Sequence, residues 1–166
     1  MNNELIRKLK EINIIEPKLV TLKNAGPSNF YVNIKKAYGY SEILNSLVDE
    51  LWKRMDKKIT CIAAGGYGGI SPATLISTRY TKNLTLVRGE SKEHGIRGQI
   101  EGYVPNKQDK IAIFDDVFTT GGSLREIIGI IKPTEAKIIG CYVFVKRREG
   151  KFEFPLTSIL KLEDLL

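Results

Sequence analysis

The sequence predicts a three-layer α/β fold, in which a parallel sheet is flanked by helices. Two stretches, residues 59–80 and 111–131, each show the pattern of an apolar strand, a glycine-containing loop and a helix. Two more apolar runs of strand length, residues 84–87 and 138–145, alternate with these helices. Strands and helices in this order form parallel sheets that are covered on both faces, because each crossover helix packs on one face.

The first of these units begins with the apolar strand expected at residues 59–64. Glycines dominate the loop at 65–69, and Ser71-Pro72 is a typical helix start. We expect that helix to run to about Tyr80. Backbone amides of such a glycine loop are free to meet phosphate oxygens, although a lone glycine loop is a weak signal.

The second unit has the same order and a more distinctive loop. A buried strand at residues 111–114 delivers two adjacent carboxylates, Asp115 and Asp116, to its carboxyl edge. That edge is where open α/β sheets bind ligands. The helix that follows is expected over residues 123–131, where Pro133 stops it.

The N-terminal part precedes this pattern. Apolar residues at helical spacing predict a helix over residues 4–12 and a longer one that begins at Ser41. Between them, residues 20–22 and 30–32 are short β-prone runs separated by a turn at 24–27, which indicates a hairpin or a bent connection.

Length and composition favour one folded domain over residues 1–166, with a small N-terminal segment at about 1–40 and a core at about 41–150. The chain has 166 residues, 42% of them hydrophobic and 27% charged, which is typical of a soluble globular protein. Neither a secretory signal pattern nor an apolar run long enough for a bilayer is evident, so a cytoplasmic location without membrane contact is the expectation.

The net charge and the few cysteine and histidine residues restrict which ligands, disulfides and metal sites are expected. The formal net charge is +7, which attracts polyanions of any kind, including nucleic acid and phosphorylated metabolites. Cys61 and Cys141 lie in expected strands and are predicted to act as small hydrophobes without a disulfide. His94 is the single histidine, so a zinc site is not expected.

The strongest chemical signal is the run at residues 111–123. Thr119, Thr120, Gly121, Gly122 and Ser123 offer successive backbone N–H groups, hydroxyls and a helix N-terminus, which together suit a phosphate monoester. The two aspartates would repel that phosphate, so they are expected to face sugar hydroxyls or positive charge that develops on the ring. The pattern is neither a Walker A loop nor a dinucleotide fingerprint. It predicts a site that binds a ribose phosphate.

This run closely resembles the phosphoribosyl pyrophosphate motif of type I phosphoribosyltransferases, in which paired acids follow four apolar residues and precede Thr-Thr-Gly-Gly-Ser. Residues 89–110 form a long polar connection, which a functional loop or a disordered insertion would explain. Its start, with Arg88, Lys92 and His94, resembles the catalytic loop of orotate phosphoribosyltransferases, and Ile-Glu-Gly at residues 100–102 is similar to the segment that closes it.

Further stretches resemble the same family. Lys23 and the pair Phe30-Tyr31 are similar to the N-terminal hood segment that contacts pyrophosphate and stacks near orotate. Arg147 resembles the arginine that approaches the orotate carboxylate. The glycine loop is similar to the family's pyrophosphate loop, with Tyr67, Gly68 and Gly69 as its expected contact residues.

Five positions depart from the family pattern, and each loses a charge contact that the family normally has. The catalytic loop has a glycine in place of its second lysine, and the other departures lie in the pyrophosphate loop, before Arg147 and in the hood. These positions are Gly89, Gly68, Lys146, Asn33 and Lys35.

The resemblance implies Mg²⁺-dependent transfer of phosphoribosyl to orotate, with release of pyrophosphate and inversion at the anomeric carbon. Asp115 and Asp116 would lie beneath the sugar, while Arg88, Lys92 and His94 would surround the pyrophosphate, with His94 as a general acid. No direct protein ligand to Mg²⁺ is expected, since the substrate holds the ion and an aspartate reaches it through water. The resemblance also implies a homodimer whose catalytic loop serves the partner's site.

Two alternatives stay open. The departures, Gly89 above all, are compatible with a phosphoribosyltransferase for another base or with a weakened paralogue. The net charge of +7 is compatible with a regulator that senses phosphoribosyl pyrophosphate and binds nucleic acid, although such a regulator has no use for Arg88, Lys92 and His94 in this arrangement.

Overall fold

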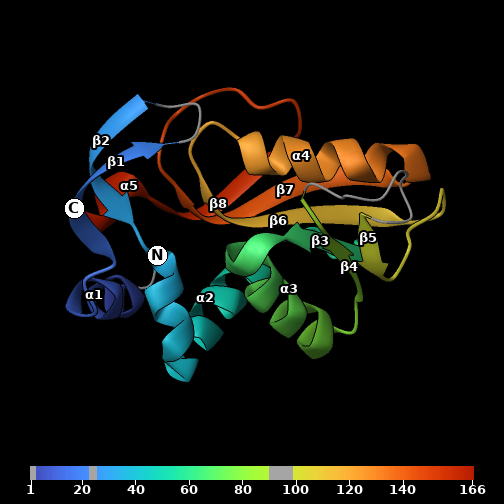
Figure 1. Ribbon diagram of the computed structural model, residues 1–166. Coiled ribbons are helices and arrows are strands. Elements are labelled where there is room, and N and C mark those ends of the chain that lie inside the picture. Colours follow the sequence, from blue (N-terminus) through green and yellow to red (C-terminus); the bar gives the residue numbers. More distant parts are fainter. Residues whose placement is uncertain (1–2, 23–25, 90–98) are drawn as a thin grey trace.

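The protein is described here by a computed structural model that covers residues 3–22, 26–89 and 99–166. Its main sheet is formed by β3 Cys61–Gly65, β4 Asn83–Val87, β5 Ile100–Gly102, β6 Lys110–Phe118, β7 Lys137–Lys146 and β8 Leu156–Lys161. Within the described chain this is a six-stranded sheet with the order β5-β4-β3-β6-β7-β8 (Figure 1). All neighbours pair in parallel except β4 and β5, which are antiparallel. The predicted α/β class is therefore confirmed, with one antiparallel edge strand that the sequence did not indicate.

Helices cover both faces of the sheet, as Figure 1 shows. The two below it in that view are α2 Ser41–Arg54 and α3 Gly66–Tyr80, and the one above it is α4 Gly122–Ile131. A short 3-10 helix, η3 Lys132–Thr134, follows α4 directly and contains the expected stop at Pro133.

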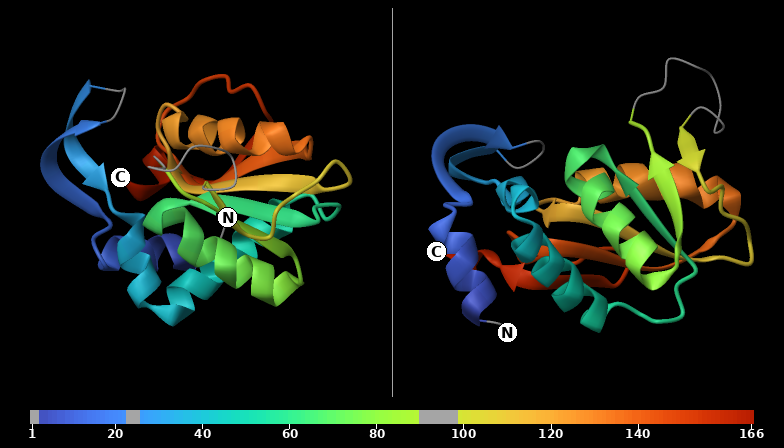
Figure 2. Two further views of the ribbon diagram at one scale, coloured as in Figure 1. Left: turned by 45° about the vertical axis from the view of Figure 1, so that its right-hand side comes forward. Right: turned by 90° about the horizontal axis from the view of Figure 1, so that it is seen from below.

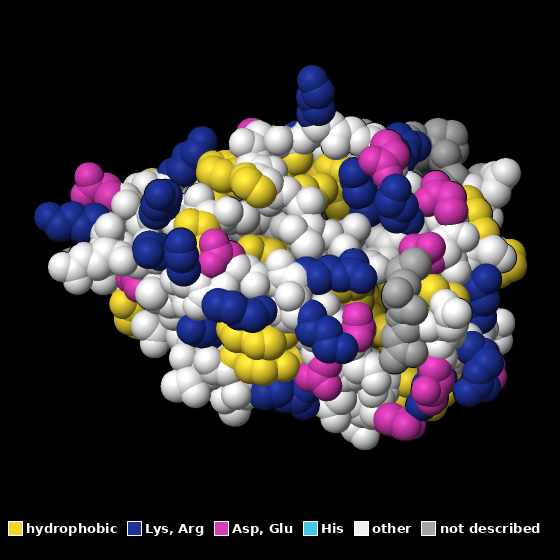
Figure 3. Space-filling view, turned by 180° about the vertical axis from the view of Figure 1, so that it is seen from behind, with side chains coloured by type: hydrophobic (Ala, Val, Ile, Leu, Met, Phe, Trp, Pro, Cys, Tyr) yellow, Lys and Arg dark blue, Asp and Glu magenta, His cyan; other side chains and the backbone are white. Residues whose placement is uncertain are grey.

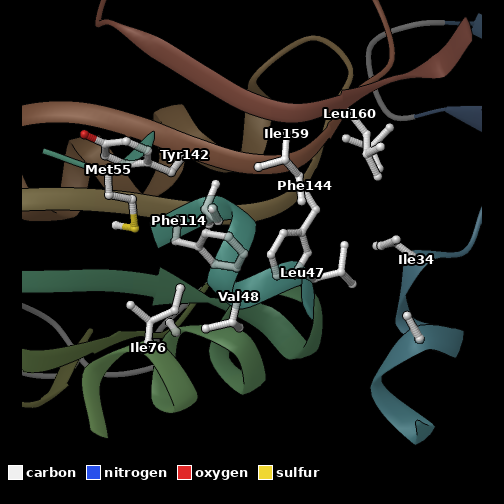
Figure 4. Close-up of a cluster of buried hydrophobic side chains, with 14 of the residues drawn as sticks. Ile34, Leu47, Val48, Met55, Ile76, Phe114, Tyr142, Phe144, Ile159 and Leu160 are labelled. Carbon is white, nitrogen blue, oxygen red and sulfur yellow. The ribbon is translucent and has the colours of Figure 1, made fainter. Parts of the chain in front are cut away.

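Strand alternation divides the interior into two cores. Ala112 and Phe114 of β6 face one core, whereas Ile111 and Ile113 face the other, because successive side chains of a strand point to opposite faces. The first core is the larger, and its rings pack closely: Phe114 and Phe144 meet edge to face with centroids 5.1 Å apart (Figure 4). Both faces of β6 are thus buried, which fixes the position of the strand end that carries the acidic pair.

The N-terminal segment forms a unit of its own at one end of the sheet. It consists of α1 Asn3–Glu11, the antiparallel hairpin of β1 Ile15–Leu22 and β2 Gly26–Val32, and the 3-10 helix η1 Ile34–Gly39. Figure 2 shows this unit beside the C-terminus, where the short helix α5 Leu162–Leu165 contacts α1. Leu5 and Leu9 of α1 are buried in the larger core. The N-terminal unit, which we call the hood, is therefore packed against the rest of the protein through α1.

Several helix and strand boundaries differ from those expected from the sequence. Helix α3 begins at Gly66 rather than at Ser71, so most of the expected glycine loop is the first turn of a helix. Strand β6 continues to Phe118, so Asp115 and Asp116 lie within the strand and not after it. Strand β8 and helix α5 were not predicted at all, because residues 151–166 lack the strand-loop-helix pattern on which the prediction depended.

Both cysteines lie where the apolar pattern placed them. Cys61 in β3 and Cys141 in β7 are buried, and burial raises the pKa of both thiols, to about 11 for Cys61 and about 12 for Cys141. Over the described residues, no helix has the length and apolar character needed to span a bilayer.

Candidate active site

The carboxyl ends of β3 and β6 and the N-termini of α3 and α4 surround a cavity of about 280 Å³. Its lining combines the acidic pair, the glycines at the start of α3 and the start of α4. The lining residues are Lys35, Gly65, Gly66, Gly68, Val87, Gly89, Asp115, Asp116, Ser123, Glu126 and Ile127. Elements separated by more than 80 positions in the sequence thus meet at the edge where α/β sheets bind ligands.

Asp115 is the buried member of the acidic pair. Its Oδ1 accepts a hydrogen bond from the Asp116 N–H at 2.9 Å. Burial, followed by the charge of Asp116, raises the pKa of Asp115 to about 7. Asp115 is thus buried although it lies near the end of its strand.

Asp116 is held on both of its oxygens. Oδ1 accepts a hydrogen bond from the Val117 N–H at 2.9 Å, and Oδ2 accepts one from Lys35 Nζ at 3.2 Å. A side chain at position 68 would collide with this carboxylate, since a Cβ built on Gly68 would lie within 2.3 to 2.8 Å of its atoms. Gly68 therefore gives Asp116 the room to point into the cavity.

The glycines of α3 place backbone, not side chains, at the cavity. Gly69 is buried, and a Cβ there would lie 3.2 Å from the Phe114 carbonyl, so the helix start approaches β6 closely. Tyr67, in contrast, is 91% exposed. Gly68 lines the cavity, whereas its neighbours Tyr67 and Gly69 are not among the described lining residues.

The expected phosphate loop, residues 119–123, runs from the end of β6 into α4. Gly121 has φ of 81°, a conformation that favours glycine, and it is the N-cap residue of α4. Gly122 opens the helix and Ser123 lines the cavity. The loop thus presents a helix N-terminus to the space beside Asp115 and Asp116.

A segment that the sequence did not single out braces this loop from outside. Arg125 Nη1 donates to the Thr120 carbonyl at 2.8 Å, and Arg125 Nε pairs with Glu153 Oε1 at 3.0 Å. The Phe152 ring lies against Gly121, where a Cβ would be 2.5 Å from a ring carbon. Arg125 also lies over this ring, with Cζ 4.9 Å from its centroid. We call these three residues, Arg125, Phe152 and Glu153, the loop brace.

A second, smaller cavity of about 150 Å³ adjoins the hood. Tyr31, Val32, Lys35, Asp116, Val117, Thr119 and Arg147 line it. Arg147 is buried; its guanidinium stacks on the Phe30 ring at 4.5 Å and donates from Nη2 to the Phe30 carbonyl at 3.1 Å. Burial, followed by the nearby Arg148, lowers the pKa of Arg147. The structure therefore brings Phe30, Tyr31 and Arg147 together, as expected.

The expected catalytic loop is described only at its two ends. Lys92 and His94 lie outside the described residues, as does Lys23. Arg88 is exposed and forms an ion pair with Glu101 of β5, Nη2 to Oε1 at 2.6 Å. Its neighbour Gly89 lines the larger cavity.

The remaining departures from the family pattern lie in different places. Lys146 pairs with Glu149 at 2.7 Å, and Asn33 donates to Glu16 Oε1 at 3.0 Å. Lys35 is different, because it lines both cavities. No role was predicted for Lys35 from the sequence, because its contact with Asp116 joins residues that are 81 positions apart.

Tyr38 is a further residue that the sequence did not single out. Its hydroxyl donates to the Gly68 carbonyl at 2.8 Å. Burial, followed by the charges of Asp116 and Asp115, raises the pKa of Tyr38 strongly, so it acts as a neutral donor. It thereby fixes the helix start that faces Asp116.

Fold and site together define an α/β protein with an acidic pair and a helix N-terminus beside a cavity at one sheet edge. Comparison with known proteins gives the family. Residues 33–157 match the phosphoribosyl transferase domain family. The orotate phosphoribosyltransferase of Methanococcus maripaludis is 34% identical over 156 residues, which cover 92% of this chain and 84% of that protein. The corresponding enzyme of Methanocaldococcus jannaschii is 32% identical over 170 residues, 97% of this chain and 96% of that protein.

Solved structures agree with this assignment. The crystal structure of orotate phosphoribosyltransferase from Aeropyrum pernix superimposes with a TM-score of 0.84 at 25% identity, over 97% of this chain and 95% of that one. An adenine phosphoribosyltransferase from Trypanosoma brucei has a TM-score of 0.75 at 13% identity, which shows a shared fold alone. The chain belongs to the phosphoribosyltransferase family and, within it, to the orotate phosphoribosyltransferases.

Proposed function

We propose that this protein transfers the phosphoribosyl group of phosphoribosyl pyrophosphate to orotate, giving orotidine monophosphate and pyrophosphate, a step of pyrimidine biosynthesis. The observation that carries the proposal is the meeting of Asp116 with both cavities. The larger cavity suits a ribose with its phosphates, and the smaller one suits a planar base. The carboxylate between them lies where a bond from sugar to base would form.

The reaction breaks the bond between the anomeric carbon and a pyrophosphate oxygen and forms a bond from that carbon to a ring nitrogen. Positive charge develops on the sugar as the first bond lengthens, and a nearby carboxylate stabilises it. Asp116 is the candidate for this role. Ser123 and the backbone N–H groups at the start of α4 hold the 5′-phosphate at the far side of the cavity.

The smaller cavity accounts for the choice of base. Tyr31 provides an aromatic wall, and Arg147 provides a guanidinium for a carboxylate. Because Arg147 is already stacked on Phe30 and bonded to its carbonyl, its position is set before the base arrives. Orotate carries a carboxylate and uracil does not, so this arginine favours orotate.

Mg²⁺ fits the acidic pair as an ion held mainly by the substrate. The carboxylates of Asp115 and Asp116 are hard oxygen donors of the type that Mg²⁺ prefers, directly or through water. Over the described residues, no group of three or more acidic, histidine or cysteine side chains gathers to hold a metal ion. When bound, Mg²⁺ would neutralise charge on the leaving pyrophosphate.

We extend the proposal to a homodimer in which Arg88, Lys92 and His94 of one subunit act at the partner's site. The resemblance of residues 88–95 to the family's catalytic loop supports this. Exposure of Arg88 on the described part of that segment is compatible with it.

The charge on the face of the molecule seen from behind does not favour a nucleic-acid regulator. On the face shown in Figure 3, Lys and Arg side chains are interspersed with Asp and Glu side chains and form no continuous basic stripe. Polyanion binding depends on such clusters of positive charge.

Pyrophosphate release with Mg²⁺, phosphoribosyl pyrophosphate and a panel of bases tests the function. Orotate should be used, and uracil and purine bases should be used poorly. A matched control is the protein with Asp115→Asn and Asp116→Asn, which should fold and lose about a hundredfold or more of the rate. Turnover with another base in preference to orotate would overturn the assignment of substrate, and near-normal turnover by the double variant would overturn the role of the acids.

A further inference from the structure

Lys35 lies between the two cavities and lines both of them. It belongs to η1, immediately after the hairpin, and its side chain is 38% exposed. Asp116 is the other charged residue that lines both cavities in the described part of the chain.

The ammonium of Lys35 makes contacts in both directions. Nζ donates to Asp116 Oδ2 at 3.2 Å and to Tyr31 Oη at 3.0 Å. It also lies 5.5 Å from the centroid of the Tyr31 ring. One cation is therefore bonded to the carboxylate at the sugar and to the aromatic wall at the base.

Neighbouring residues show that this inward direction is specific to Lys35. Lys36 has the same exposed fraction, 38%, yet pairs with Glu16 Oε1 at 2.9 Å. Asn33 also donates to Glu16, and its N–H donates to the Ile14 carbonyl at 2.7 Å. These contacts hold the start of η1 against β1 and the residue that precedes it. The backbone of Lys35 is therefore held in place while its side chain reaches the site.

The contacts of Lys35 with Asp116 and Tyr31 have a consequence for both halves of the site. Without the ammonium, Asp116 would lie beside the adjacent Asp115, and the Val117 N–H would be the donor that remains to it among the contacts described above. The Tyr31 hydroxyl would lose its donor at the same time. A change at one residue would then disturb the sugar half and the base half together.

We propose that Lys35 is a positioning residue that couples phosphoribosyl binding to base binding, by holding Asp116 and Tyr31 in one hydrogen-bonded unit. The proposal rests on the proposed function for the identity of the ligands. In this proposal Lys35 acts on the ligands through the side chains of Asp116 and Tyr31. It therefore predicts that the effect of removing Lys35 disappears when those side chains are removed first.

The test measures the affinity of orotidine monophosphate, which occupies both halves of the site, by calorimetry. Lys35→Met should weaken this affinity about tenfold, Lys35→Arg should restore most of it, and Lys36→Met should change it less than about twofold. In the background Tyr31→Phe with Asp116→Asn, Lys35→Met should cost less than about threefold, because the Tyr31 hydroxyl and the negative charge of Asp116 are already absent.

Turnover supplies an independent readout. Lys35→Met should lower kcat about tenfold or more and raise the KM of both substrates, whereas loss of a purely structural residue would lower the active fraction and leave both KM values unchanged. Thermal unfolding checks that the variant is folded; if it is not, Lys35→Arg with the same background cycle is the deciding comparison.

The inference is overturned if Lys35→Met leaves affinity unchanged, if Lys36→Met has an equal effect, or if the loss is as large in the Tyr31→Phe, Asp116→Asn background as in the parent protein. Failure of the proposed function is a separate result. It would appear as absence of turnover by the unmodified protein with every base, while nucleotide affinity still reports on Lys35.

Discussion

The hydroxyl of Tyr38 donates to the carbonyl of Gly68 at 2.8 Å, and Gly68 is the residue four positions before Pro72 within α3. In an α-helix the N–H of residue 72 would bond to the carbonyl of residue 68. Proline has no N–H, so this carbonyl lacks its helical donor. Tyr38 replaces the missing donor from a different element, at the helix turn that faces Asp116.

Tyr38→Phe should therefore destabilise the protein by about 1 to 2 kcal/mol, because a half-buried carbonyl is left without its partner. Urea unfolding of the parent and the variant measures this difference. Tyr40→Phe is the matched control, since Tyr40 is 53% exposed, and it should change stability by less than about 0.5 kcal/mol.

Pro72→Ala supplies the sharper comparison. Alanine restores an N–H at position 72, so Tyr38→Phe should cost clearly less in that background than in the parent protein. An equal cost in both backgrounds would show that the Tyr38 hydroxyl stabilises something other than the Gly68 carbonyl.

The pair Tyr38 and Gly68 also illustrates what a sequence can and cannot predict. Strands and helices of the core were predictable because their apolar residues repeat with the period of each element. The turn at residues 119–122 that leads into α4 was predictable because its glycines and hydroxyl residues are local in sequence. Contacts such as Tyr38 with Gly68, 30 positions apart, depend on how the hood packs on the sheet, which no local pattern encodes.

Burial of Asp115 has the same origin. The sequence shows two adjacent acids at a strand end, and their alternation predicts that they point to opposite faces. It does not show that α3 and α4 both close over the strand end and bury one of the two acids. That difference in burial makes Asp115 and Asp116 unlike each other.

Stability should depend on pH through Asp115. Its pKa is raised to about 7 in the folded protein by burial and by Asp116, above its ordinary value in an unfolded chain. The stability that this group contributes is fully present below its unfolded pKa and is lost as pH rises through about 7.

Asp115→Asn removes this titration. Relative to the parent protein, the variant should therefore gain unfolding free energy between about pH 5 and about pH 8, on the order of a few kcal/mol at most. Urea unfolding without Mg²⁺ or substrate at both pH values measures the change. A constant difference between the two proteins would mean that Asp115 does not titrate in this range.

Arg147 should set the preference for orotate. The unmodified protein should favour orotate over uracil by more than about a hundredfold in kcat/KM, because uracil lacks the carboxylate that the guanidinium would bind. Arg147→Ala should reduce this preference to less than about tenfold. Arg148→Ala is the control, since Arg148 is adjacent and exposed, and it should keep the preference. Equal use of both bases by the unmodified protein would remove this role from Arg147.

Subunit mixing should test the shared site. Lys92→Ala keeps the acidic pair, and the variant with Asp115→Asn and Asp116→Asn keeps the loop; each should be inactive alone. If the loop acts on the partner, a mixed dimer has one intact site, so random exchange should restore roughly a quarter of normal activity. Exchange confirmed by mass without recovered activity would show that the loop acts on its own subunit or has no catalytic part.

The loop brace should control affinity for the phosphoribosyl substrate. Phe152 covers Gly121, and Arg125 holds the Thr120 carbonyl, so both fix the backbone that is expected to bind the 5′-phosphate. Phe152→Ala should raise the KM for phosphoribosyl pyrophosphate about fivefold to tenfold, with kcat changed less than about twofold, because the loop must be ordered again on binding. Phe154→Ala is the matched control, since Phe154 belongs to the same segment and packs against the smaller core, which contains Ile111 and Ile113. Phe154 is not among the described contacts of residues 119–123. Initial rates over a range of substrate concentrations measure both constants. An equal rise in KM for the two variants would trace the effect to general loosening of residues 147–155 and would remove the specific role of Phe152.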